Sequence, residues 1–157
     1  MTRPSLISFV FPSMNEAPKV FLRTLLYCTS DRGQYVQNMY VRLTRDGIAQ
    51  DFNLWHHGDD KTVRGSGIFA SRSGVVCYHH FVLTKEDAFQ FSPGDYNVQV
   101  FVEPVDDHPK LIFEHELSFE LTEEQSRRNK TAVLFNWEPS FGAYGVEVNS
   151  QNEIYIV

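Results

Sequence analysis

The chain has 157 residues, of which 42% are hydrophobic and 14% aromatic, and its formal net charge is −6. That length suits one domain with a real core, and that apolar content excludes a disordered chain. The acidic balance argues against a nucleic-acid-binding protein, which normally turns a basic face toward the phosphates. The 13 Phe and 7 Tyr residues favour β-strands, where aromatic side chains pack well.

The first residues do not match an export signal or a membrane anchor. The apolar run from Leu6 to Phe11 is shorter than the core of a signal peptide, and Pro12 closes it. No run approaches the ~18 to 20 apolar residues that span a bilayer. We therefore expect a cytoplasmic protein without membrane contact. Cys28 and Cys77 lie in apolar surroundings and outside any CxxC motif, so we expect two buried thiols rather than a disulfide.

Alternation of apolar and polar residues at period two predicts strands along nearly the whole chain. In chain order the predicted strands are 6–11, 20–28, 35–44, 48–55, a short one near 68–69, 75–83, 95–103, 110–121, 132–137, 144–148 and 153–157. The clearest pair, 95–103 and 110–121, flanks the turn-forming segment PVDDHP and predicts a hairpin. No linker or repeat interrupts the pattern, so we expect a single domain over residues 1–157.

Helix signals are few. Thr84 followed by Asp87, and Thr122 followed by Gln125, each match a capping box that starts one or two helical turns. After Thr122 two glutamates fall in the first turn and two arginines near the last, which suits the helix dipole. The predicted fold class is therefore all-β with one or two short helical turns.

The segment TKEDAFQFSPGDYNVQVFVE, residues 84–103, resembles the E–F corner and the following strand of immunoglobulin-like sandwiches. In that family a tyrosine opens the penultimate strand and its hydroxyl bonds back to the corner, which gives Tyr96 this role. Val98 replaces the cysteine of the family's disulfide, and Val41 stands near the expected tryptophan, so an antibody-like domain is excluded. The resemblance implies an immunoglobulin-like antiparallel β-sandwich, with extra C-terminal strands after a last family strand at 110–121.

The stretch HHGDD gathers possible metal ligands. His56 and His57 are neighbours on a predicted strand, so they point to opposite faces and reach one ion only if the chain turns there. Asp59 and Asp60 are typical turn residues, whose side chains bond the backbone locally. Spacings typical of zinc or iron sites, such as HxH or HxxxH, are absent. We therefore interpret the stretch as a polar turn between two strands.

The stretch CYHH supports an alternative hypothesis. Cys77 and His79 share one face of a predicted strand, and His57 and Asp59 could join them from another strand, with His115 as a further ligand. On this alternative the protein is a metal-dependent enzyme. No phosphate-binding loop, GxSxG or other motif of recognised catalytic spacing occurs in the sequence. We therefore favour a protein without catalytic activity and without a cofactor.

Aromatic residues favour a binding module. The stretch NWEPSFGAYG places Trp137, Phe141 and Tyr144 in a predicted loop, and exposed rings often mark a protein or sugar surface. The final apolar residues, which include Tyr155, could pair with a partner strand or with another copy of the chain. We predict a non-enzymatic module that contacts a protein partner or itself, as a homo-oligomer, through an edge strand and this aromatic loop. Carbohydrate binding through the same loop is a second alternative.

Overall fold

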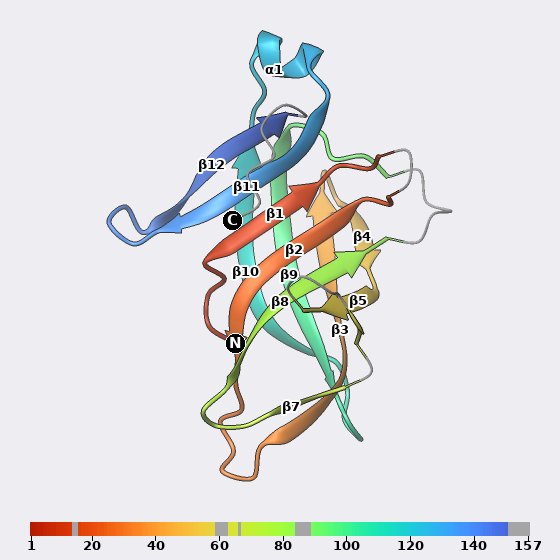
Figure 1. Cartoon of the computed structure of the whole chain (residues 1–157), viewed down its shortest axis with the longest axis vertical. Coiled ribbons are helices and arrows are strands. Elements are labelled where there is room, and N and C mark those ends of the chain that lie inside the picture. The colour runs from red at the N-terminus through yellow and green to blue at the C-terminus, as the bar shows by residue number, and fades with distance from the viewer. Residues whose placement is uncertain (14–15, 59–62, 66, 84–88, 151–157) are drawn as a thin grey trace.

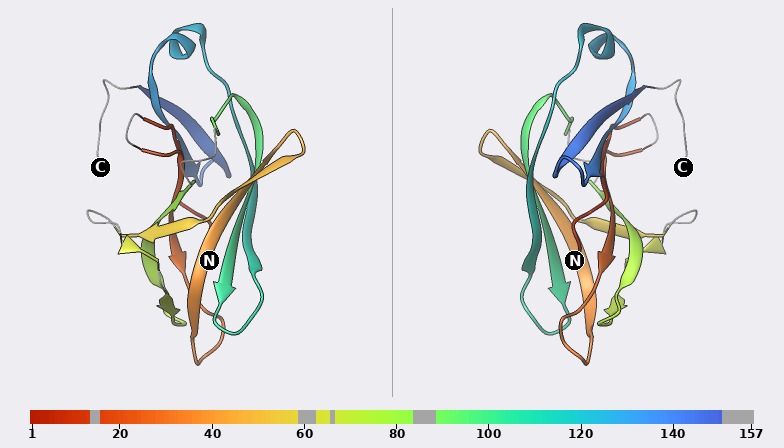
Figure 2. Two further views of the ribbon diagram at one scale, coloured as in Figure 1. Left: turned by 90° about the vertical axis from the view of Figure 1, so that its right-hand side faces the viewer. Right: turned by 90° about the vertical axis from the view of Figure 1, so that its left-hand side faces the viewer.

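The computed structural model describes residues 1–13, 16–58, 63–65, 67–83 and 89–150, with only the backbone at 76–77. These residues form an all-β fold with two antiparallel sheets and one short helix (Figure 1). The prediction of an all-β fold with little helix is confirmed. Figure 2 presents the two sheets as separate layers, which pack face to face.

The larger sheet has seven strands in the order β12-β11-β1-β2-β8-β5-β6. Its strands are β1 (Leu6–Val10), β2 (Lys19–Leu26), β5 (Leu54–His57), β6 (Val63–Arg64), β8 (Val75–Val82), β11 (Lys130–Glu138) and β12 (Ala143–Ser150). The smaller sheet has the order β10-β9-β3-β4, and β7 pairs with one end of β3. Its strands are β3 (Gln34–Arg45), β4 (Ile48–Phe52), β7 (Ile68–Ala70), β9 (Gly94–Pro104) and β10 (Lys110–Phe119).

The apolar faces of the two sheets meet in one core. In β9 the alternate residues are buried, namely Tyr96, Val98, Val100 and Val102. From the opposite layer Phe9 stacks on Phe91, with ring centroids 4.9 Å apart, and meets the ring of Tyr96 edge-on at 5.2 Å. Each fully buried side chain of this size stabilises the fold by about 1.5–3 kcal/mol.

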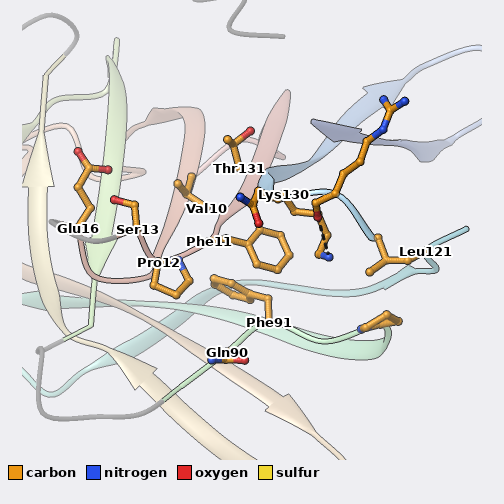
Figure 3. A pocket seen from close by; sticks show the side chains of 13 residues that line it. Val10, Phe11, Pro12, Ser13, Glu16, Gln90, Phe91, Leu121, Lys130 and Thr131 are labelled. Atoms are coloured by element: carbon orange, nitrogen blue, oxygen red, sulfur yellow. Dashed lines mark hydrogen bonds between the residues drawn. The ribbon is translucent and has the colours of Figure 1, made fainter. Parts of the chain in front are cut away.

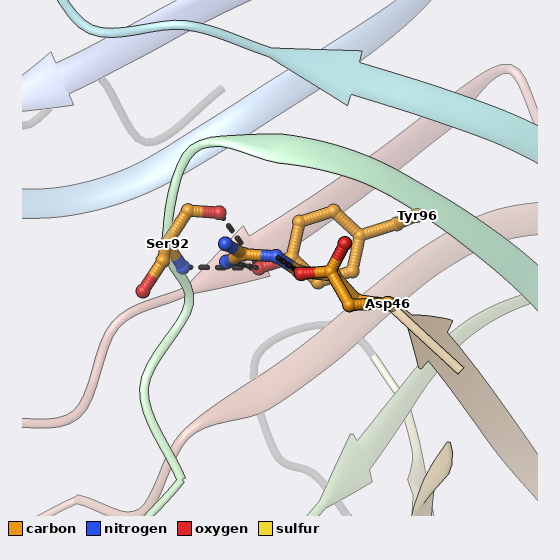
Figure 4. Close-up of polar contacts among 4 residues, drawn as sticks. Asp46, Ser92 and Tyr96 are labelled. Atoms are coloured by element: carbon orange, nitrogen blue, oxygen red, sulfur yellow. Dashed lines mark hydrogen bonds and ion pairs between the residues drawn. The ribbon is translucent and has the colours of Figure 1, made fainter. Parts of the chain in front are cut away.

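The Tyr96 side chain ties the start of β9 to the loop that precedes it (Figure 4). Its hydroxyl donates to the Ser92 carbonyl at 2.7 Å and accepts from the Ser92 N–H at 3.0 Å. The guanidinium of Arg45 donates to the same hydroxyl at 3.4 Å and also pairs with Asp46. The predicted bond from the Tyr96 hydroxyl back to the corner is therefore confirmed.

The predicted strand 48–55 is two strands, in two different sheets. The chain leaves the smaller sheet after Phe52 and joins the larger sheet at Leu54. Phe52 and Trp55 are both buried, yet they are three residues apart, so one continuous strand would turn them to opposite faces. Crossing between the layers at Asn53 lets both rings reach the same core.

Helix α1 (Glu123–Arg127) begins with the predicted capping box. The Gln125 N–H donates to the Thr122 hydroxyl at 3.1 Å, and the Thr122 N–H donates to Oε1 of Gln125 at 3.0 Å. This helical turn is confirmed. The other predicted turn, which starts at Thr84, and the predicted strand at 153–157 lie outside the described residues.

Candidate functional site

The β11–β12 hairpin ends the larger sheet and projects beyond the rest of the sandwich, on the left of Figure 1. β12 pairs with β11 from Ala143 to Ser150. On the opposite side of β12 no strand of the described residues pairs with it. The hairpin therefore presents a row of backbone N–H and C=O groups that an added strand can bind.

Trp137 and Tyr144 lie in this hairpin as direct cross-strand partners, with ring centroids 5.1 Å apart in an edge-on arrangement. The strand ladder continues to Glu138 and Ala143, and the turn is confined to residues 139–142. Trp137 and Tyr144 therefore lie in the predicted strands 132–137 and 144–148, and of the three aromatic residues expected in a loop only Phe141 lies in the turn. The guanidinium of Arg3 lies 3.9 Å from the centre of the Trp137 ring. Arg3 therefore covers one face of the Trp137 ring, and less of that ring is open to stack against a sugar.

Tyr144 is held by the beginning of the chain. Its hydroxyl donates to the Pro4 carbonyl at 2.7 Å. Burial raises the pKa of Tyr144, an effect only partly opposed by the positive charge of Arg3, so the hydroxyl stays protonated and remains a donor. The ring also meets His115 of β10 at 5.1 Å, which links the hairpin to the smaller sheet.

The exposed large apolar side chains of the hairpin are Phe141 and Val146. Phe141 lies in the turn and is 79% exposed; its N–H and that of Gly142 both donate to the Glu138 carbonyl. Val146 lies on the inner face of β12, opposite the buried Phe135, yet it is 47% exposed. Phe141 was predicted as a contact residue and Val146 was not, although the alternation in YGVEV places Val146 on the same face as Tyr144 and Val148. Tyr155, the fourth predicted contact residue, lies outside the described residues.

Four histidines of the two predicted metal stretches lie together. β5 pairs with β8 so that His57 is opposite His79 and His56 is opposite His80. The interpretation of HHGDD as a turn is wrong for the two histidines, which end β5. The ladder even continues to Gly58, whose N–H donates to the Tyr78 carbonyl at 3.1 Å.

His79 is fully buried, and Trp55 fixes its ring. The indole N–H of Trp55 donates to Nδ1 of His79 at 3.1 Å. Burial, followed by the charges of His57 and His80, lowers the pKa of His79 from 6.5 to about 4. Because an indole can only donate, Nδ1 must carry the lone pair, and the neutral ring holds its proton on Nε2. Nε2 has no hydrogen-bond partner in the structure as described.

This protonation pattern opposes a metal ion at His79. A histidine that binds a metal through Nε2 normally carries its proton on Nδ1 and donates it to an acceptor. Here the group beside Nδ1 of His79 is the indole N–H of Trp55, which is itself a donor and cannot accept that proton. Within the described residues no group of three or more His, Cys, Asp or Glu is placed to hold a metal. Asp59 and the side chain of Cys77 lie outside the description, and His115 packs against Tyr144 instead. The structure thus brings together His57 and His79 of the predicted set.

A groove of about 670 Å³ opens at the end of the sandwich where β1 ends and β11 begins (Figure 3). Phe11, Phe91 and Leu121 give it apolar walls. Its two basic side chains already have partners. Lys130 donates at 3.4–3.5 Å to the carbonyls at the end of α1, and Arg128 pairs with the glutamate four residues before it. The groove therefore offers apolar walls, and its basic side chains are already engaged by groups of α1 and its end.

No family model matches the chain, and no curated protein or solved structure matches it significantly. No helix within the described ranges is long and apolar enough to cross a bilayer. The β11–β12 hairpin combines exposed apolar side chains with a strand edge that no strand of the described residues pairs with, and neither the histidine pairs nor the groove offers a comparable combination.

Proposed function

We propose that this protein is a non-enzymatic binding module that contacts other proteins through the edge of β12 and the tip of the β11–β12 hairpin. The observation that carries the proposal is the eight-residue edge strand with Val146 and Phe141 exposed beside it. Backbone hydrogen bonds to an added strand would supply affinity, and the two apolar side chains would supply selectivity. Cytoplasmic localisation and independence of any cofactor belong to the same proposal.

A comparison with the edge strand β10 supports the choice of β12. β10 has a bulge between Leu111 and Phe113, and it carries Glu114 and Glu116 at exposed positions. Bulges and charged side chains are the usual means by which an edge strand avoids pairing. β12 has no proline or lysine, and Glu147 is its one charged residue. Its edge is therefore the less protected of the two.

We also propose that the sandwich is immunoglobulin-like. The neighbours β1-β2-β8-β5 in one sheet and β10-β9-β3-β4 in the other match the family's strand orders A-B-E-D and G-F-C-C′. The bond from Tyr96 to Ser92 supports the same assignment. The β11–β12 hairpin would then be an addition beside the first strand. Because such a fold carries no function by itself, the functional proposal depends on the added hairpin.

Phe141→Ser tests the proposed contact, because Phe141 is exposed and its loss should leave the fold intact. Trp137 is less suitable, since it also holds Arg3. Ile48→Ser is a matched control, being 75% exposed on the smaller sheet. With immobilised protein as bait, we expect Phe141→Ser to lose the proteins that the wild type and Ile48→Ser retain. Retention of the same bound proteins by Phe141→Ser would contradict the proposal.

A further inference from the structure

We propose that the partner at the β12 edge is a second copy of the chain, which adds its own β12 antiparallel and joins the two seven-stranded sheets. This inference rests on the proposed function, because it uses the same strand edge. It adds the identity of the partner and the register in which the two strands pair.

β12 is complementary to itself in one register, centred on Val146. In that register the two copies of Val146 face each other, Tyr144 of each copy faces Val148 of the other, and Glu147 faces Gly145. Directly opposite residues then lie on the same face of the joined sheet, so the inner faces of both copies stay on one side. A two-fold axis passes through the Val146 pair, as a symmetric dimer requires.

The neighbouring registers fit less well. A shift by two residues in one direction places Glu147 opposite Glu147, and like charges in direct cross-strand positions are destabilising. The shift in the other direction centres the pairing on Gly145 and places Val148 opposite Gly142, which lies in the turn outside β12. A shift by one residue would turn the inner face of one copy outward. The charge and the apolar residues of β12 therefore select the same register.

The exposure of Val146 gives this pairing a driving force. Val146 is on the inner face, yet it is 47% exposed, because it lies on the last strand of the larger sheet. In the proposed dimer the two Val146 side chains would lie about 4.5–5.5 Å apart and cover each other. The side chains of β12 form a pattern that is complementary about Val146, with Tyr144 opposite Val148 and Gly145 opposite Glu147. A second copy of β12 has this complementary pattern, whereas the strand of an unrelated protein would have it only by coincidence.

A charge-swap experiment tests the symmetry of the pairing. Val146→Asp and Val146→Lys each place two like charges at the two-fold axis, whereas a mixture of the two variants places opposite charges there. We expect the wild type to dimerise in sedimentation equilibrium over a concentration series. Each variant alone should dimerise at least about tenfold more weakly, and the equimolar mixture should recover the dimer. Ile48→Asp and Ile48→Lys, alone or mixed, should behave as the wild type does.

Several outcomes would overturn the proposal. A wild type that stays monomeric, dimers that survive in Val146→Asp and Val146→Lys, or a mixture that recovers no dimer would each do so. If a chain that ends at Ser150 dimerises while the full chain does not, residues 151–157 and not a second copy would be the group that occupies the edge of β12 in the full chain. Phe141→Ser separates the two proposals. If no dimer forms but this variant still loses bound proteins, the binding function stands and only the second copy is wrong.

Discussion

Acidification should destabilise the fold through His79. The pKa of this buried ring is lowered from 6.5 to about 4, chiefly by burial and further by the charges of His57 and His80. Between these two values the unfolded chain binds a proton that the folded chain excludes. The free energy of unfolding should therefore fall as the pH falls from about 6.5 to about 4, and below that the loss is complete.

The size of the effect follows from the two pKa values. They differ by 2.5 (6.5 less about 4), and each pKa unit corresponds to 1.36 kcal/mol, so the predicted loss is about 3 kcal/mol. A domain of this kind is held together by about 5–15 kcal/mol in total. A single histidine would thus remove a substantial part of the stability in mild acid.

The assay is urea denaturation at pH 7 and pH 4 of the wild type and of His79→Asn. Asparagine does not titrate, and its amide oxygen can accept the Trp55 N–H in place of Nδ1. The variant should be less stable at pH 7, but its free energy of unfolding should fall by about 3 kcal/mol less on acidification than that of the wild type. His108→Asn, at an exposed position, is the control and should keep the wild-type pH dependence. Equal pH dependence in the wild type and His79→Asn would refute the reasoning, as would an NMR titration of His79 with a midpoint near 6.5.

Two other predictions follow from contacts of the described residues. Tyr96→Phe removes both hydrogen bonds to Ser92 and should lower the free energy of unfolding by about 1–3 kcal/mol in urea denaturation. A loss within the error of the wild-type measurement would mean that the corner bond contributes nothing. Protein purified without added metal should contain no transition metal bound through His79. Trp55 donates to Nδ1 of this histidine, so the His79 proton stays on Nε2 and neither nitrogen has a lone pair free for a metal. If elemental mass spectrometry finds about one equivalent of a transition metal in the wild type and none in His79→Asn, the hypothesis of a metal-dependent enzyme would be supported instead.

Local patterns predicted the strands well, because each depends on residues close in sequence. The alternation in β9 was predicted from neighbouring residues. The bond from the Tyr96 hydroxyl back to its corner was expected from the resemblance of residues 84–103 to immunoglobulin-like sandwiches, and the structure gives Ser92 as its partner. The crossing at Asn53 was missed because it depends on which layer each strand joins. The proximity of His57 and His79 entered only as part of the alternative metal-site hypothesis. Their direct pairing could not be derived from the sequence, since the adjacency of β5 and β8 is decided by the topology of the whole sheet.

The aromatic residues of the hairpin were predicted to form the contact surface, and their contacts give them a different part in the same site. Arg3 lies against Trp137, and the Tyr144 hydroxyl donates to the Pro4 carbonyl, so the beginning of the chain clamps both strands of the hairpin. The backbone N–H of Trp137 also donates to the Ser5 carbonyl at 3.0 Å. A strand edge that is already ordered loses little conformational entropy when a partner strand adds to it, and this favours binding. Trp137 and Tyr144 therefore hold the edge in place, and the proposed partner would contact Phe141, Val146 and the backbone of β12.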